Sequence, residues 1–93
     1  MLEIIRDNDK NIIACCEWYL VDINGKMDDK GNYVWINEVE INPSQRGNGL
    51  LKKFIKIITD KAPQSEYGYF QRRKYKDRVR MYSRKKWLKL TED

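Results

Sequence analysis

Residues 39–58 constrain the fold of this chain more than any other stretch. An apolar strand pattern ends just before Pro43, glycines follow at positions 47 and 49, and an apolar face with helical spacing begins directly after them. The sequence therefore predicts a strand, a tight turn and an amphipathic helix in immediate succession. Backbone N–H groups at such a helix start, together with the helix dipole, favour a bound anion, so we expect a phosphate-bearing ligand.

The length of 93 residues suits one small domain over residues 1–93. No signal-peptide pattern and no apolar run near the roughly 20 residues of a membrane helix is present, so we expect a cytoplasmic protein without membrane contact. The chain has no histidine, which argues against a zinc site and against Ser-His or Cys-His catalysis. Cys15 and Cys16 are neighbours on a predicted strand, so their side chains point to opposite faces and do not pair.

The net charge of +5 is unevenly distributed. Residues 1–42 hold 4 basic and 9 acidic side chains, whereas residues 43–93 hold 15 basic and 5 acidic ones. A polyanion is therefore expected to meet the C-terminal half, as a nucleotide, a nucleic acid or a phosphorylated cofactor.

The periodicity predicts a mixed α/β arrangement of short elements. Expected strands are Leu2–Arg6, Ile12–Asp22, Tyr33–Ile41, Tyr67–Arg72 and Trp87–Leu90, and expected helices begin after Gly49 and cover Lys74–Lys85. In the third strand, alternation places Trp35, Asn37, Val39 and Ile41 on one face and Ile36, Glu38 and Glu40 on the other. The first helix should bury Leu50, Leu51, Phe54, Ile55 and Ile58 and expose Lys52, Lys53 and Lys56.

The glycine turn and its surroundings resemble the GNAT superfamily of acyl-CoA-dependent N-acetyltransferases. The strand end Val39-Glu40-Ile41, the proline at 43 and Arg46-Gly47-Asn48-Gly49 match the family pattern of Arg/Gln-x-x-Gly-x-Gly/Ala after a strand. The sixth motif position is Leu51, where the family usually has Gly or Ala. In the segment 81–87, Tyr82 and Trp87 match in spacing the tyrosine and the final aromatic of an aromatic-Tyr-x-x-x-Gly-Phe segment on the family's last helix, with Lys86 in place of the Gly.

The resemblance implies a mixed, mainly antiparallel sheet with two helices, a GNAT-like fold that lacks the usual N-terminal helices. It implies acetyl-CoA or another acyl-CoA as cofactor. The backbone of Val39 and Ile41 would pair with the pantetheine arm, and the turn amides from Arg46 through Gly47, Asn48 and Gly49 to Leu51 would hold the pyrophosphate. Lys52 and its neighbour Lys53, or arginines of the second expected helix, would meet the 3′-phosphate.

The implied reaction is direct attack of an amine acceptor on the acyl thioester. The family's usual acid is the tyrosine matched here by Tyr82, and Glu38 and Glu40 are the candidate bases. Two carboxylates this close raise each other's pKa, which suits a base near neutral pH. The acceptor could be a small amine, a peptide N-terminus, a protein lysine or an antibiotic.

Structural alternatives stand beside each of these roles. Tyr82 could be a core aromatic, the two glutamates a solvated strand face, and the lysines a wet helix face. Residues 72–89 carry ten basic side chains and one acid with interleaved aromatics, a pattern typical of nucleic-acid binders. A second hypothesis is therefore a non-catalytic α/β module that binds nucleic acid or an acidic partner through a basic C-terminal helix. Either a monomer or a homodimer is compatible with the sequence.

Overall fold

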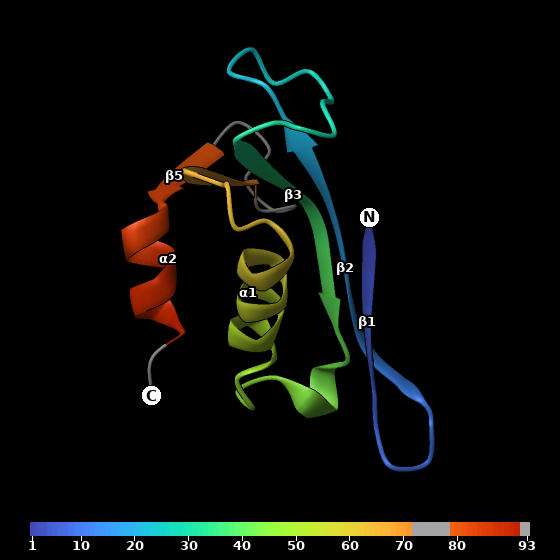
Figure 1. Ribbon diagram of the computed structural model, residues 1–93. Helices are drawn as coiled ribbons and strands as arrows, with labels where there is room; N and C mark the ends of the chain where they lie inside the picture. The colour runs from blue at the N-terminus through green and yellow to red at the C-terminus, as the bar shows by residue number, and fades with distance from the viewer. Residues whose placement is uncertain (72–78, 92–93) are drawn as a thin grey trace.

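The computed structural model describes residues 1–71 and 79–91. Along the chain these form β1 (Leu2–Arg6), β2 (Ile12–Val21), β3 (Tyr33–Ile41), the 3-10 helix η1 (Pro43–Gln45), α1 (Leu50–Lys61), β4 (Tyr67–Gln71), β5 (Val79–Ser83) and α2 (Arg84–Leu90). The strands form one sheet in chain order, and only the pair β3–β4, which is joined through α1, is parallel. The expected mixed, mainly antiparallel sheet with two helices is confirmed (Figure 1).

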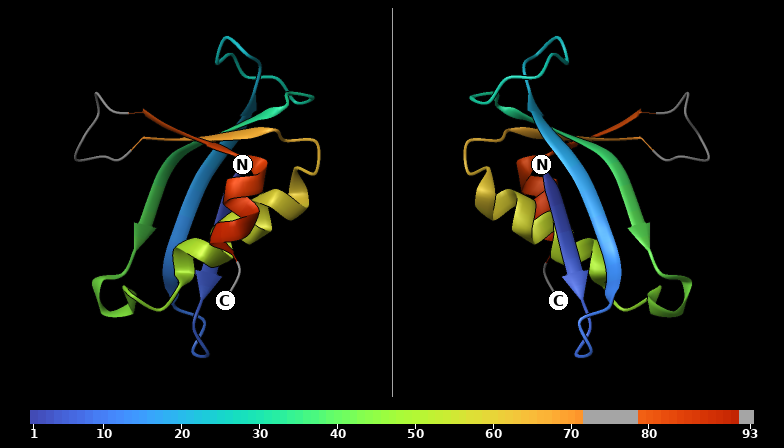
Figure 2. Two further views of the ribbon diagram at one scale, coloured as in Figure 1. Left: turned by 90° about the vertical axis from the view of Figure 1, so that its left-hand side faces the viewer. Right: turned by 90° about the vertical axis from the view of Figure 1, so that its right-hand side faces the viewer.

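Both helices lie against the same face of the sheet (Figure 2). The core between the two layers contains Ala14, Cys16 and Trp18 of β2, Val34 and Ile36 of β3, Leu50, Phe54, Ile55 and Ile58 of α1, and Trp87 of α2. Among the described residues no helix covers the opposite face of the sheet. None of the helices in this part of the chain is long and apolar enough to cross a membrane.

Leu51 departs from the expected apolar face of α1, because its side chain is 41% exposed. It lies in the first turn of α1, at the end of the sheet where β4 no longer accompanies β3.

The alternation expected for β3 is wrong from Glu38 onward, because the strand contains a bulge. Ile36 and Glu38 face consecutive residues of β2, which leaves Asn37 as an extra residue. The bulge moves the following side chains to the other face. The face covered by helices therefore holds Ile36, Val39 and Ile41, and the uncovered face holds Trp35, Asn37, Glu38 and Glu40.

Both C-terminal elements differ from the sequence prediction. Within the range expected to be a helix, residues 79–83 form β5, and residues 72–78 lie outside the described part of the chain. The strand expected at 87–90 belongs instead to α2. Alternating side chains at 79–83 fit a strand as well as a helix, and antiparallel pairing with β4 decides the outcome. Ser83 then caps α2, because its hydroxyl accepts a hydrogen bond from the Lys86 N–H at 3.3 Å.

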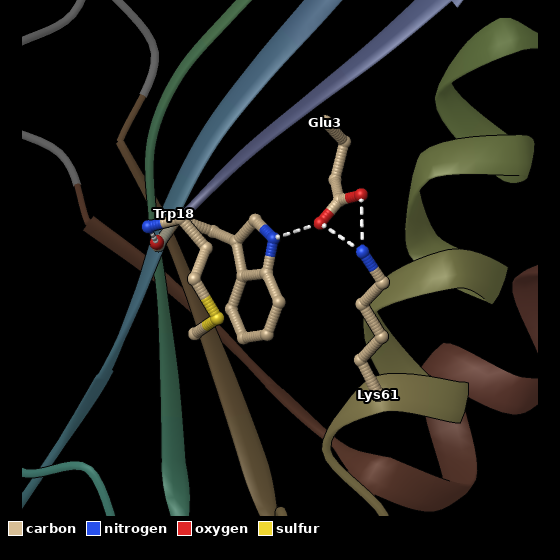
Figure 3. A network of polar contacts seen from close by, with 4 residues as sticks. Glu3, Trp18 and Lys61 are labelled. Carbon is tan, nitrogen blue, oxygen red and sulfur yellow. Dashed lines mark hydrogen bonds and ion pairs between the residues drawn. The ribbon is translucent and has the colours of Figure 1, made fainter.

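A polar network joins β1, β2 and α1 (Figure 3). The carboxylate of Glu3, which is only 8% exposed, accepts hydrogen bonds from the indole N–H of Trp18 at 3.0 Å and from the ammonium of Lys61 at 2.7 Å. Burial acts to raise the pKa of Glu3, but the hydrogen bonds from Lys61 and Trp18 outweigh it, and the net shift is downward. The network fixes the edge strand β1 to the helix layer.

Candidate functional site

The site begins where β3 and β4 separate. β4 pairs with β3 only as far as Ile36, whereas β3 continues to Ile41, and Figure 2 shows the two strands running apart. Asn42 donates its N–H to the Ile13 carbonyl on β2 at 2.8 Å. Because successive residues of a strand point their backbone groups in opposite directions, the N–H and C=O of Val39 and Ile41 point away from β2. They face the side from which β4 has departed.

The turn after η1 exposes a row of backbone donors. Gly47 and Gly49 have φ values of 86° and 75°, a left-handed conformation that glycine adopts without strain. Gly49 is the N-cap of α1 and supplies no side-chain cap. None of the N–H groups of residues 47–52 has a hydrogen-bond acceptor among the described residues. The first turn of α1 also contains no acidic side chain. This donor set suits phosphate oxygens.

Three cations surround this turn. Arg46 follows η1 as its C-cap, and Lys52 and Lys53 lie in the first turn of α1. All three side chains are exposed. A cavity of about 580 Å³ opens beside Arg46 at the ends of β2 and β3. Its lining is Ile12, Ile13, Ala14, Cys15, Val39, Glu40, Ile41, Asn42, Pro43 and Arg46. Predicted phosphate-binding and strand-end residues are therefore adjacent in the fold.

The two predicted bases lie on the uncovered face of the sheet. Glu38 is directly opposite Glu17 on β2, and Glu40 is opposite Cys15. The amide of Asn37 donates to the Glu17 carboxylate at 2.6 Å. Hydrogen bonds from Tyr19 and then from Asn37 lower the pKa of Glu17, which is therefore ionised at neutral pH.

Tyr82, the predicted acid, is on β5 rather than on a helix. It pairs with Gly68, and its half-buried ring packs on the core side of the sheet with the Lys86 ammonium 5.2 Å from the ring centroid. Tyr82 and the two predicted bases consequently lie on opposite faces. A group placed in the opening between β3 and β4 can be approached from both faces.

Sequence analysis missed Asn37 and Glu17. A bulge depends on how two strands register, so β3 alone gave no signal for the position of Asn37. The sequence does give a signal for Glu17, because this carboxylate lies between two apolar residues of a predicted strand. Among residues 1–71 and 79–91, no group of three or more Cys, Asp and Glu side chains could hold a metal ion.

Comparison with solved structures identifies the architecture. The chain matches the crystal structure of a GNAT family N-acetyltransferase (YhbS) from Escherichia coli in complex with CoA, with a TM-score of 0.57 and 16% sequence identity. The fold is GNAT-like. The match covers 73% of this chain but only 37% of the YhbS chain, so the present chain corresponds to about a third of that protein's length. No protein-family model and no curated protein matches the sequence.

Proposed function

We propose that this chain binds acetyl-CoA or another acyl-CoA beside the diverging ends of β3 and β4 and transfers the acyl group to an amine. The observation that carries the proposal is the combination, in a GNAT-like fold, of a strand end that β4 does not accompany with an amide-rich helix start. The pairing groups of Val39 and Ile41 and the donors of residues 47–52 are adjacent because α1 follows β3 after one short turn.

Each of these groups has a defined part in cofactor binding. Val39 and Ile41 hydrogen-bond the amides of the pantetheine arm as an added strand would. The N–H groups from Gly47 to Lys52 hold the pyrophosphate, with Arg46 beside them. Lys52 and Lys53 add positive charge for the 3′-phosphate. Leu51, partly exposed at the same end of the helix, packs against the arm rather than against the core.

Acyl-CoA supplies an acyl group activated as a thioester. The amine must lose a proton before or during attack, and Glu38 or Glu40 on the uncovered face takes it. The Asn37 bulge points both carboxylates to that face, so the amine approaches from there. Tyr82 is the proposed donor to the leaving thiolate, and it acts from the helix-covered side of the opening.

Calorimetric titration with acetyl-CoA tests the proposal. We expect binding by the wild type and its loss in Gly49→Glu, because a carboxylate placed at the helix start repels the pyrophosphate. Gly25→Glu is the matched control, since Gly25 also has a positive φ, of 80°, with open space around it, but lies in the β2–β3 connection. Absence of binding by the wild type, or equal loss in both variants, would refute the proposal.

A second candidate function is binding of a polyanion by the helix layer. Exposed lysines lie on both helices of this layer, at Lys52, Lys53, Lys56 and Lys61 of α1 and Lys85, Lys86 and Lys89 of α2. Such binding weakens steeply with salt and does not depend on Gly49. Tyr82→Phe separates the two functions, because it should lower acyl transfer by about 10²-fold or more and leave polyanion binding unchanged.

A further inference from the structure

The uncovered face of the sheet carries an aromatic cluster, which consists of Tyr19, Tyr33, Trp35, Tyr67 and Tyr69. Cross-strand pairing places Tyr19, Trp35 and Tyr69 in one row across β2, β3 and β4. The rings of Trp35 and Tyr69 lie 6.0 Å apart, and those of Tyr33 and Tyr67 also 6.0 Å. All five side chains keep exposed surface. A contiguous exposed aromatic patch of this kind marks a binding surface.

Carboxylates lie beside the aromatic cluster, three at one end and one, Asp22, at the other, where Asp22 also accepts the N–H groups of Asn24 and Lys26 within its own turn. At one end Glu17, Glu38 and Glu40 lie on the same face of β2 and β3. At the other end, Asp22 lines a hollow of about 240 Å³ together with Trp35 and Tyr69. The charged side chains that β2 and β3 place on this face are all acidic.

The basic residues of α1 and α2 lie on the opposite side of the sheet. Among the described residues of β2, β3 and the two helices, charge is thus segregated between the two layers, with carboxylates on the uncovered face of a chain whose net charge is positive. Exposed charges are screened within about 8 Å in physiological salt, so a ligand at this face responds to the nearby carboxylates. These carboxylates repel the phosphates of a nucleic acid. In a dimer formed through this face, the carboxylates of the two copies would repel each other.

We infer that the uncovered sheet face binds a lysine-rich peptide segment. Ammonium groups would lie over the Trp35 and Tyr69 rings, where cation–π attraction operates, and would pair with Glu38 and Glu40. The face extends along β3 from Tyr33 to Glu40, roughly 25 Å of strand, which an extended peptide spans and a small amine does not. If the proposed acyl transfer also holds, a lysine of this peptide is the acceptor, and only this last step rests on the proposed function.

Trp35 supplies an intrinsic probe of peptide binding. The other two tryptophans, Trp18 and Trp87, are 0% and 3% exposed, so a ligand at the surface changes chiefly the emission of Trp35. Titration with an oligolysine peptide should give a saturable change in fluorescence that weakens as salt is raised. Replacing two exposed carboxylates in E38Q/E40Q should weaken binding about five-fold to tenfold. Asp60→Asn on α1 removes the same kind of charge from the other layer and should leave binding unchanged.

The aromatic contribution is tested separately with Tyr69→Ala, after circular dichroism shows that the variant is folded. We expect a further several-fold loss of affinity, with Tyr69→Phe close to wild type because the ring remains. No response to oligolysine, an equal effect of D60N and E38Q/E40Q, or a Trp35 response to a single-stranded oligonucleotide instead would overturn the inference. Titration of the wild type with acetyl-CoA is independent of these results, so failure of peptide binding is distinguishable from failure of cofactor binding.

Discussion

Gly68 is the point at which the sheet makes its closest approach to α2. A Cβ atom at this position would lie 1.8 Å from the Trp87 ring, far inside van der Waals contact. Gly68→Ala should therefore force the buried indole or the backbone to move and destabilise the fold by about 1 to 3 kcal/mol. Urea unfolding measures the effect.

A double variant checks the mechanism. Trp87→Leu creates space beside Gly68, so the alanine should cost less in that background than in the wild type. Equal costs in the two backgrounds would mean that contact with Trp87 is not the cause.

Glu3 links stability to pH at a single carboxylate. Its folded-state pKa is lowered below the ordinary value of 4.5, so its contribution is fully present above that value and is lost as pH falls through the folded-state pKa. Removing its charge in Glu3→Gln should destabilise the protein at neutral pH by about 1 to 3 kcal/mol. The free energy of unfolding of wild type and variant, measured from pH 7 downward, should converge in acid. A difference that stays constant with pH would contradict this role.

At the scale of elements, local signals account for what the sequence predicted. The β3–turn–α1 unit follows from residues close in sequence: a strand pattern, Pro43, two glycines and an apolar helix face. The Asn37 bulge and the identity of β5 depend instead on pairing with distant strands. Tyr82 and Trp87 illustrate this limit, because their spacing matches one family helix whereas the structure places Tyr82 on β5 and Trp87 on α2.

The side chain of Arg84 connects the start of α2 to the segment after α1. Its guanidinium is therefore engaged within the fold and less available to a polyanion. Its half-buried guanidinium donates to the carbonyls of Ala62 at 3.1 Å and Ser65 at 3.3 Å, just after the C-terminus of α1. Arg84 also donates to the Thr59 carbonyl at 3.4 Å, which is one of the last four carbonyls of α1 and has no partner within the helix. Arg84→Ala should thus destabilise the fold by about 1 to 3 kcal/mol, whereas Lys85→Ala, one residue further on, should change stability by less than about 0.5 kcal/mol. Equal effects in thermal unfolding would show that Arg84 carries no structural role.

At the scale of the whole molecule, the two layers differ in chemistry. The helix layer is basic and covers the apolar core, while the exposed side of the sheet is aromatic and acidic. The two proposed ligands, one phosphate-rich and one cationic, would therefore meet the chain on different sides. The opening between β3 and β4 lies between these surfaces, which is where a transfer from one ligand to the other would occur.

The rate at which Cys16 reacts with a thiol reagent shows whether the sheet and the helix layer separate only when the whole domain unfolds. Cys16 is fully buried, and burial raises the pKa of its thiol to about 12, so at pH 7 to 9 it stays protonated and out of reach of thiol reagents. Cys15 is half-buried on the opposite face and should react with a disulfide reagent before Cys16. The slower reaction, that of Cys16, should follow the rate or the free energy of global unfolding. It should be faster in Gly68→Ala, because this substitution loosens the same core. A Cys16 reaction that is fast and insensitive to this variant would show that the layers separate locally, without unfolding of the whole domain.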